Sequence, residues 1–205
     1  MKTVFFDIDT QIDFMLPAGA LYVPGAEGIL PAVAGLNQFA AANGMMVVST
    51  MDAHTENDEE FLRWPPHCVA GCNGQRKPSQ TLLASRAVVT SVPGWAGPLD
   101  TQQILLEKQT FDCFSNPNLS RVLQELAADR YVVYGVVTEI CVQFALFGLL
   151  RTGARVEIVG DAVRSLRAEA AEAMLVEFRA AGGMVTGMAA LGLTRKGSRN
   201  PNSRI

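Results

Sequence analysis

The chain has 205 residues, of which 49% are hydrophobic and 18% are charged. This is the balance of a compact globular protein with a sizeable core, and it excludes a disordered chain. The formal net charge of -3 offers no basic surface for nucleic acid, and no apolar run reaches the length of a membrane span.

Strand and helix patterns alternate along the chain. Apolar runs predict strands at Thr3–Asp7, Met45–Met51, Ala87–Val92, Ile104–Lys108, Tyr131–Val137, Arg155–Val159 and Met184–Thr186. Helical spacing predicts helices at Gly28–Asn43, Asn118–Ala128, Glu139–Arg151 and Arg167–Ala181. This alternation predicts parallel β-α-β units, and so a Rossmann-like, three-layer α/β/α fold with a central, mostly parallel sheet. We expect one domain over residues 1–195, followed by a loose polar tail, residues 196–205.

The N-terminus and the cysteines bear on the compartment. The apolar segment Val4–Phe6 is followed directly by acidic residues, and it lacks the basic start and long apolar stretch of a signal peptide. A chain of this size does not need disulfides between its four cysteines, Cys68, Cys72, Cys113 and Cys141. We therefore expect a cytoplasmic protein with reduced thiols.

Reactive side chains follow four of the predicted strands. Asp9, Asp52, Lys108 and the segment Thr138–Cys141 each lie at or just past a strand end. Ligands of parallel sheets bind beyond the carboxyl ends of the strands. The four strands are therefore expected to bring these residues to the same edge of the sheet.

Cys141 stands at a strand-to-helix junction, where two interpretations are open. The positive end of the helix dipole would lower the pKa of its thiol and make it a nucleophile, and the same N–H groups could hold an oxyanion. Alternatively, Cys141 is a small buried filler on an apolar helix.

Asp9 and Lys108 are the candidate partners of this thiol. Burial at a strand end would raise the pKa of the Asp9 carboxylate and let it accept the thiol proton, although most aspartates at such positions cap turns. A lysine is usually a surface charge. Between Asp9 and Cys141, however, Lys108 would fix the ionised forms of both.

The long segment from Asp52 to Thr81 lacks periodicity and contains both histidines of the chain. Asp52, His54 and His67 form a possible metal set, because Asp and His two residues apart can turn toward one ion and a third ligand leaves a position open. The alternatives are local hydrogen bonds, or a closed zinc site of His67, Cys68 and Cys72.

The chain resembles the isochorismatase-like cysteine hydrolases, and most of all the nicotinamidases among them, from about residue 3 to residue 192. The resemblance is carried by ordered motifs: Asp9-Thr10-Gln11-Ile12-Asp13-Phe14, Gly19-Ala20-Leu21, Val23-Pro24-Gly25, Ser49-Thr50-Met51-Asp52-Ala53-His54, Trp64-Pro65-Pro66-His67-Cys68-Val69, Lys108, Gly135 through Cys141, and Asp161-Ala162-Val163. Each motif alone is modest, but their order and spacing together are specific.

The resemblance implies a function for each matching residue. The catalytic triad maps onto Asp9, Lys108 and Cys141, and a cis peptide between Val136 and Val137 would direct N–H groups of Val137 and Cys141 at an oxyanion. A divalent metal (zinc, iron or manganese) on Asp52, His54 and His67 would hold the pyridine nitrogen of nicotinamide. Phe14 and Trp64 match positions that pack on the substrate ring. The implied enzyme is a homo-oligomer that converts this small-molecule amide into nicotinate and ammonia in pyridine nucleotide salvage.

One departure keeps other substrates open. Nicotinamidases often carry another histidine shortly after the first, whereas here the stretch Thr55–Glu60 has none. Relatives that share the triad but lack the metal cleave carbamoyl, ureido or other linear amides. The vinyl-ether-cleaving isochorismatases, which do not need the cysteine, and a non-catalytic protein of the same fold are further alternatives.

A phosphatase is the most distant alternative. The segment Val4–Thr10 is similar to the first motif of the haloacid dehalogenase-like phosphatases, in which Asp7 would be the nucleophile. However, Thr10-Gln11 replaces the expected Gly-Thr step, and the second acid expected after Asp161 is missing, with Arg164 and Ser165 nearby instead.

Overall fold

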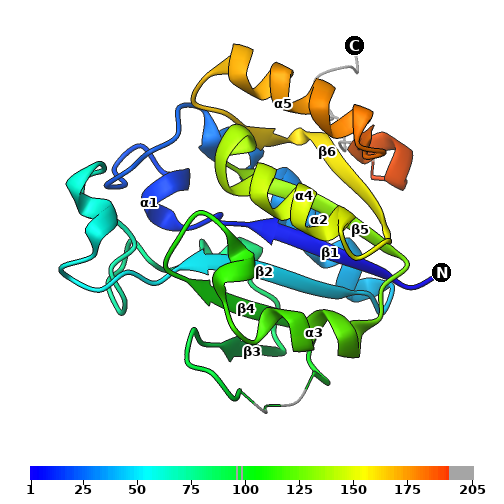
Figure 1. Cartoon of the computed structure of the whole chain (residues 1–205), viewed down its shortest axis with the longest axis horizontal. Coiled ribbons are helices and arrows are strands. Elements are labelled where there is room, and N and C mark those ends of the chain that lie inside the picture. Colours follow the sequence, from blue (N-terminus) through cyan, green and yellow to red (C-terminus); the bar gives the residue numbers. More distant parts are fainter. Residues whose placement is uncertain (96, 98, 194–205) are drawn as a thin grey trace, which may run out of the picture.

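One seven-stranded sheet runs through the computed structural model, which describes residues 1–95, 97 and 99–193 (Figure 1). The strands are β1 (Thr3–Ile8), β2 (Met46–Asp52), β3 (Arg86–Val89), β4 (Gln103–Lys108), β5 (Arg130–Val136), β6 (Arg155–Arg164) and β7 (Met184–Thr186). They lie in the order β3-β4-β2-β1-β5-β6-β7, and every neighbouring pair is parallel. The tail predicted at residues 196–205 lies outside the described residues.

Helices cover both faces of this sheet. They are α1 (Ile12–Met15), α2 (Leu30–Ala42), α3 (Leu119–Leu126), α4 (Gln143–Leu150) and α5 (Ala168–Ala180). Helix α2 packs against β1 and β2 on one face, whereas α3, α4 and α5 lie over the other face (Figure 1). The predicted three-layer α/β/α architecture is therefore confirmed, and the sheet is fully parallel.

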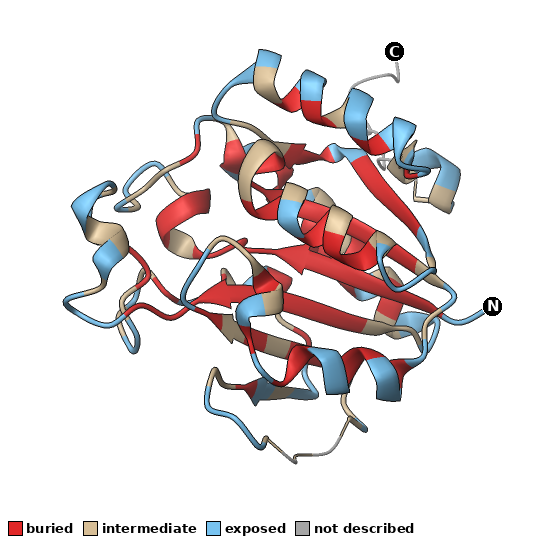
Figure 2. Ribbon diagram, viewed as in Figure 1, coloured by how far each residue is buried: buried red, intermediate tan, exposed pale blue. Residues whose placement is uncertain are grey.

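The core lies between these layers, and the central strands are buried on both sides (Figure 2). Successive residues of β1 serve opposite faces. Phe5 packs 6.2 Å from the ring of Phe39 on α2, and Phe6 packs edge-on at 5.6 Å against Tyr131 of β5. This double burial explains why β1 reads as a continuous apolar run rather than an alternating one.

The predicted elements differ from the structure mainly at their ends. Strand β6 continues to Arg164 instead of ending at Val159, because Ala162 and Val163 are again buried beside β5. The helix predicted over Glu139–Arg151 begins with a widened turn, Thr138–Val142, before α4. The short helix α1 was not predicted, since four residues are too few to show a helical period.

Candidate active site

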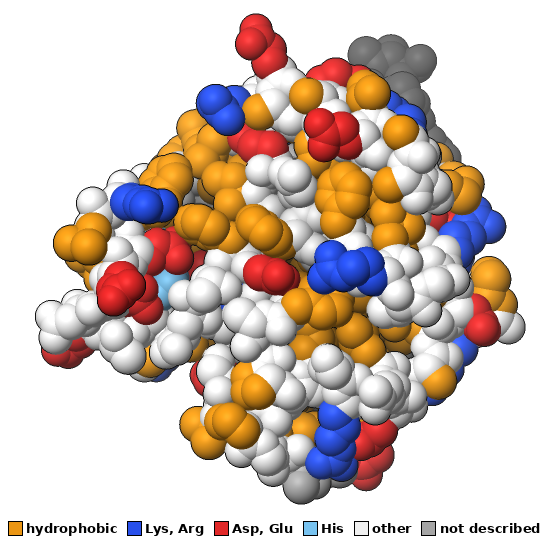
Figure 3. All heavy atoms as spheres, viewed as in Figure 1, with side chains coloured by type: hydrophobic (Ala, Val, Ile, Leu, Met, Phe, Trp, Pro, Cys, Tyr) orange, Lys and Arg blue, Asp and Glu red, His pale blue; other side chains and the backbone are white. Residues whose placement is uncertain are grey.

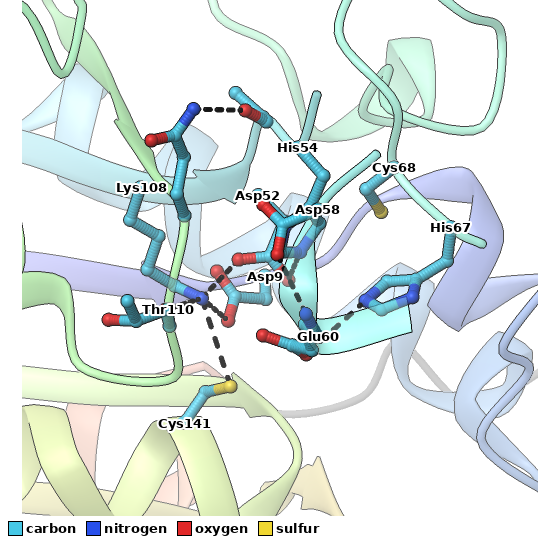
Figure 4. Close-up of polar contacts among 12 residues, drawn as sticks. Asp9, Asp52, His54, Asp58, Glu60, His67, Cys68, Lys108, Thr110 and Cys141 are labelled. Atoms are coloured by element: carbon cyan, nitrogen blue, oxygen red, sulfur yellow. Dashed lines mark hydrogen bonds and ion pairs between the residues drawn. The ribbon is translucent and has the colours of Figure 1, made fainter. Parts of the chain in front are cut away.

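The carboxyl ends of four adjacent strands bring the predicted reactive residues together. Asp9 follows β1, Asp52 ends β2, Lys108 ends β4, and Cys141 follows β5. These strands are neighbours in the order β4-β2-β1-β5, and Asp52 is directly paired with Lys108. The side chains point into one cluster (Figure 4), as predicted from the strand ends.

Lys108 occupies the centre of this cluster and is 1% exposed. Its Nζ lies 2.9 Å from Oδ2 of Asp9 and 3.8 Å from Sγ of Cys141, and it donates to the carbonyl of Thr110 at 3.0 Å. It also forms a short ion pair with Asp52. Burial lowers the pKa of Lys108, but the two carboxylates outweigh burial and hold this pKa well above its usual value. The two carboxylates therefore favour the positively charged form of Lys108 within the site.

Asp9 is fixed by Thr50 of the neighbouring strand. The Thr50 hydroxyl donates to Oδ1 of Asp9 at 2.7 Å, and the backbone N–H of Asp9 donates back to Thr50. Burial raises the pKa of the Asp9 carboxyl, and the neighbouring Lys108 ammonium offsets this only in part. The raised pKa makes Asp9 a stronger base than an exposed carboxylate, as expected for a strand-end aspartate that is desolvated.

Cys141 is a free cysteine whose residue is 8% exposed. Burial raises the pKa of its thiol well above the usual value, and Asp9 and Asp52 raise it further against the effect of Lys108. The sequence-based prediction of a lowered pKa at the start of the helix was therefore wrong, because desolvation outweighs the favourable electrostatics there. The thiol needs a base to remove its proton.

Asp52, His54 and His67 form the group that could hold a metal ion. Within residues 1–95, 97 and 99–193, they are the one set of three possible ligands with donor atoms all within 4.8 Å of one another. His54 follows β2, and backbone pairing brings His67 beside it. The N–H of His54 donates to the carbonyl of Cys68 at 3.2 Å, and the N–H of Ala70 donates to the carbonyl of His54 at 2.9 Å.

The two imidazoles are oriented as metal ligands would be. Nδ1 of His54 lies 3.0 Å from Oδ2 of Asp58, which leaves the buried Nε2 without a hydrogen-bond partner, 3.8 Å from Asp52. Nδ1 of His67 donates to the carbonyl of Pro65 at 2.8 Å, so Nε2 carries the free lone pair. A carboxylate or carbonyl behind each ring is the usual support of metal-binding histidines. These residues therefore fit a divalent metal.

Opposite charges within this group shift the pKa values of its members. Burial lowers the pKa of His54, but the neighbouring carboxylates of Asp52 and Asp58 outweigh this effect and raise the pKa to about 9. Burial raises the pKa of Asp52, but Lys108 and His54 outweigh it and lower the pKa.

The alternative zinc site of His67, Cys68 and Cys72 is not formed. Sγ of Cys68 lies 3.9 Å from the carbonyl of Gly74, and Sγ of Cys72 accepts from the N–H of Gln75 at 3.4 Å. Among the residues that the structure describes, no group of three possible ligands includes a cysteine. Both thiols therefore make local contacts within the segment from Cys68 to Gln75.

An apolar pocket lies between Cys141 and the metal group. It is lined by Phe14, Leu21, Val23, Asp52, Glu60, Trp64, His67, Phe111, Val137, Ile140, Cys141 and Leu166. Phe14 and Trp64, which the resemblance implied as contacts of the substrate ring, both line this pocket, and Phe14 packs 5.4 Å from the ring of His67. Sequence reasoning missed the lining residues Glu60, Phe111 and Leu166, because no motif singled them out. Figure 3 shows acidic side chains gathered around a histidine at the hollow on this face.

The turn before Cys141 approaches β1 closely. The peptide bond between Val136 and Val137 is cis, as the resemblance implied. Gly135 has a φ of +120°, and a Cβ there would lie 2.1 Å from the carbonyl oxygen of Ile8. Only glycine lets β5 pass so near to β1 at this point.

Asp7 does not have the surroundings of a phosphatase nucleophile. Its side chain is fully buried, and its carboxylate receives the Lys77 ammonium at 3.1 Å and the Thr10 hydroxyl at 2.6 Å. A group enclosed in this way cannot meet a phosphate ester. In the part of the chain that the structure describes, no helix is long and apolar enough to cross a membrane.

The fold with this group of residues at its carboxyl edge defines an isochorismatase-like hydrolase. Residues 3–190 match the model of the isochorismatase domain, and the chain belongs to the isochorismatase family.

The chain is also similar to individual proteins of known name. The chain is 24% identical to the nicotinamidase of Escherichia coli (strain K12) over 179 residues, which cover 78% of this chain and 81% of that protein. It superposes on the zinc complex of Pyrococcus horikoshii pyrazinamidase with a TM-score of 0.76 and 25% identity, covering 91% and 99% of the two chains. N-carbamoylsarcosine amidase of Thermoplasma acidophilum shares the fold, with a TM-score of 0.74, 22% identity, and coverage of 91% and 96%.

Proposed function

We propose that this protein is an amidohydrolase that cleaves nicotinamide to nicotinate and ammonia through a thioester on Cys141. The observation that carries the proposal is a single apolar pocket with the Cys141 thiol and the group of Asp52 and His67 in its wall. A planar amide with a ring nitrogen can place its carboxamide carbon at the thiol and its ring nitrogen at the metal group at the same time. The E. coli nicotinamidase and P. horikoshii pyrazinamidase are proteins with this kind of activity by name.

The charge of the pocket favours a neutral amide. Its wall carries two acidic side chains, Asp52 and Glu60, and no arginine or lysine among the described residues. Lys108, behind the wall, already faces Asp9, Asp52 and the carbonyl of Thr110. An ammonium group has three donors, so none is left for a substrate carboxylate. A carbamoyl amino acid would therefore lack a counterion that nicotinamide does not need.

Proton transfer from Cys141 to Asp9 begins the reaction. The thiolate sulfur attacks the carboxamide carbon, and the C=O π electrons move to the oxygen, which accepts hydrogen bonds from the backbone N–H groups of Val137 and Cys141. Asp9 returns the proton to the nitrogen, the C–N bond breaks, and ammonia leaves. Lys108 stays protonated and keeps Asp9 ionised until the transfer. Asp9 then removes a proton from water, whose oxygen attacks the thioester carbon and displaces the thiolate. Asp9 returns this proton to the sulfur, which regenerates both the thiol and the ionised carboxylate.

Asp52, His54 and His67 would hold a divalent metal beside this reaction. When bound, the metal supplies a Lewis-acid contact for the ring nitrogen of the substrate and so orients the ring. Phe14 and Trp64 bound the ring on its apolar sides. The chain's own residues carry out every proton transfer.

Ammonia release from nicotinamide by the purified protein tests this proposal. We expect turnover that is lost on chelation and restored by zinc, iron or manganese. Cys141→Ala should lower turnover at least about 10⁴-fold, in line with the loss of a covalent nucleophile, while the circular dichroism spectrum is unchanged. Substantial turnover by Cys141→Ala would exclude the thioester mechanism.

Ureido and carbamoyl compounds serve as the control substrates. Turnover of these, without turnover of nicotinamide, would keep the cysteine chemistry and exclude the metal-guided pocket. Glu59→Gln is a control variant. Glu59 is an exposed acid that lies next to Glu60 in the chain but outside the apolar pocket that Cys141 lines. It should retain nicotinamide turnover.

A further inference from the structure

A second buried ion pair, Asp7–Lys77, lies outside the proposed catalytic machinery. Asp7 is 0% and Lys77 is 4% exposed, and Nζ of Lys77 lies 3.1 Å from Oδ2 of Asp7. A buried ion pair contributes little to stability, since desolvation of the two charges offsets their attraction. Its presence therefore calls for a role other than general stabilisation.

The pair is held by hydrogen bonds from three parts of the chain. The Asp7 carboxylate accepts from the hydroxyls of Thr10 at 2.6 Å and Ser49 at 2.8 Å, and Lys77 also donates to the Thr10 hydroxyl at 3.0 Å. The amide of Asn37 on α2 lies 3.5 Å from the same carboxylate. Lys77 is thus anchored to Asp7 of β1 and to Thr10 of the turn that follows Asp9, and Ser49 holds the same Asp7 carboxylate from β2.

The residues just before Lys77 run along that turn. The backbone N–H of Ile12 donates to the carbonyl of Arg76 at 2.8 Å, and the N–H of Asp13 donates to the carbonyl of Gly74 at 3.1 Å. A Cβ on Gly74 would lie 2.1 Å from the Asp13 carboxylate, so the contact is close. We call residues 67–77 the clasp segment. Its second half, which contains Gly74 and Arg76, lies against the Asp9–Asp13 turn.

The other end of the clasp segment carries a proposed metal ligand. Oδ2 of Asp13 accepts from the N–H of Cys68 at 2.7 Å, immediately after His67. Gln11 donates to the carbonyls of Asp52 and Gln75, both at 2.8 Å, and accepts from the N–H of Asp52 at 2.7 Å. The clasp segment, the Asp9–Asp13 turn and the end of β2 therefore form one hydrogen-bonded unit.

We propose that Lys77 is a positioning residue: its buried ion pair with Asp7 locks the clasp segment against the Asp9–Asp13 turn and so places His67 for metal binding. Lys77 touches neither the substrate pocket nor a proposed ligand. Its effect on metal affinity rests on the proposed function, whereas its effect on the clasp segment does not.

Lys77→Met tests the proposal, since it removes the charge and keeps most of the side-chain volume. Hydrogen exchange of the metal-free protein should become at least tenfold faster in peptides covering residues 67–77. Titration with cobalt(II), followed by its absorption spectrum, should show an affinity about tenfold weaker, at the lower end of the loss seen for outer residues of metal sites.

Arg130→Met is the matched control. Arg130 forms an ion pair with the buried Glu157 at the opposite end of the strands, with contacts of 2.8 and 2.6 Å. This variant should leave both the exchange of residues 67–77 and the cobalt affinity unchanged. An equal effect of Arg130→Met would show general destabilisation and overturn the proposal.

A second variant covers the case in which Lys77→Met does not fold. Asp7→Asn/Lys77→Met removes both charges, so no unpaired buried charge remains, and it must show the same faster exchange. Wild-type exchange of residues 67–77 in either folded variant would refute the positioning role. If the wild-type protein binds no cobalt, the metal site fails, and the exchange experiment alone decides the role of Lys77.

Discussion

Replacement of Lys108 by Met should reveal how strongly the active-site cluster depends on one positive charge. The change leaves two buried carboxylates, Asp9 and Asp52, without the ammonium that lies 2.9 Å from the first and in short contact with the second. Removal of one partner of a buried ion pair costs about 3–5 kcal/mol of unfolding free energy. We expect a loss in this range for the metal-free protein at pH 8.

The sign of the pH dependence gives a second check on Lys108→Met. Burial raises the pKa of Asp9, and Lys108 lowers it, so the variant should have a still higher pKa for Asp9 in the folded state. The unfolded value is about 3.9. A carboxyl with a raised pKa binds its proton more tightly in the folded state, so its stabilising contribution is present at low pH and is lost as pH rises through the folded pKa. The variant should therefore recover part of its lost stability between pH 8 and pH 5.

Urea unfolding with a chelator present, at pH 8 and at pH 5, measures both effects. Lys2→Met is the control, because Lys2 is exposed and such changes stay within about 0.5 kcal/mol. A loss below 1 kcal/mol for Lys108→Met at pH 8, or an equal loss at both pH values, would refute the assignment of Lys108 as the counter-charge of this cluster.

Three further substitutions probe separate parts of the site. Asp58→Asn removes the carboxylate behind His54, and zinc affinity measured by calorimetry should fall about 10–100-fold; an unchanged affinity would contradict the supporting role. Trp64→Leu should raise KM for nicotinamide about tenfold in steady-state assays, because the aromatic contact is lost, and it should affect kcat less. Val88→Leu is the control at an exposed position outside the pocket, and it should leave KM and kcat unchanged. Gly135→Ala would place a Cβ 2.1 Å from the carbonyl of Ile8, so we expect little soluble protein on expression, and a wild-type melting temperature would disprove the close approach.

The strand-end rule explains why much of the site could be predicted from the sequence. Asp9, Asp52, Lys108 and Cys141 each follow an apolar run, and parallel strands share one carboxyl edge whatever their order. The order of the strands in the sheet was not predicted. This order places the four strands that carry the site next to one another. The rule therefore located these residues correctly without giving the contacts between them.

Properties that depend on burial and long-range pairing could not be predicted from the sequence. The direction of the Cys141 pKa was predicted wrongly, because the dipole of a helix can be inferred from a pattern but the desolvation of one thiol cannot. The pairing of Asp7 with Lys77 was missed for a different reason. The two residues are 70 positions apart, and Lys77 lies in the long segment without periodicity, where no pattern marks its contacts.

The raised pKa values of Asp9 and Cys141 have a common consequence for the chemistry. Burial penalises the carboxylate and the thiolate alike, so a proton that moves from sulfur to oxygen exchanges one buried anion for another. The net charge of the cluster does not change in this step, and Nζ of Lys108 lies within 4 Å of both the Asp9 carboxylate and the Cys141 sulfur. A dry pocket therefore does not oppose the transfer as it would oppose ionisation of the thiol alone.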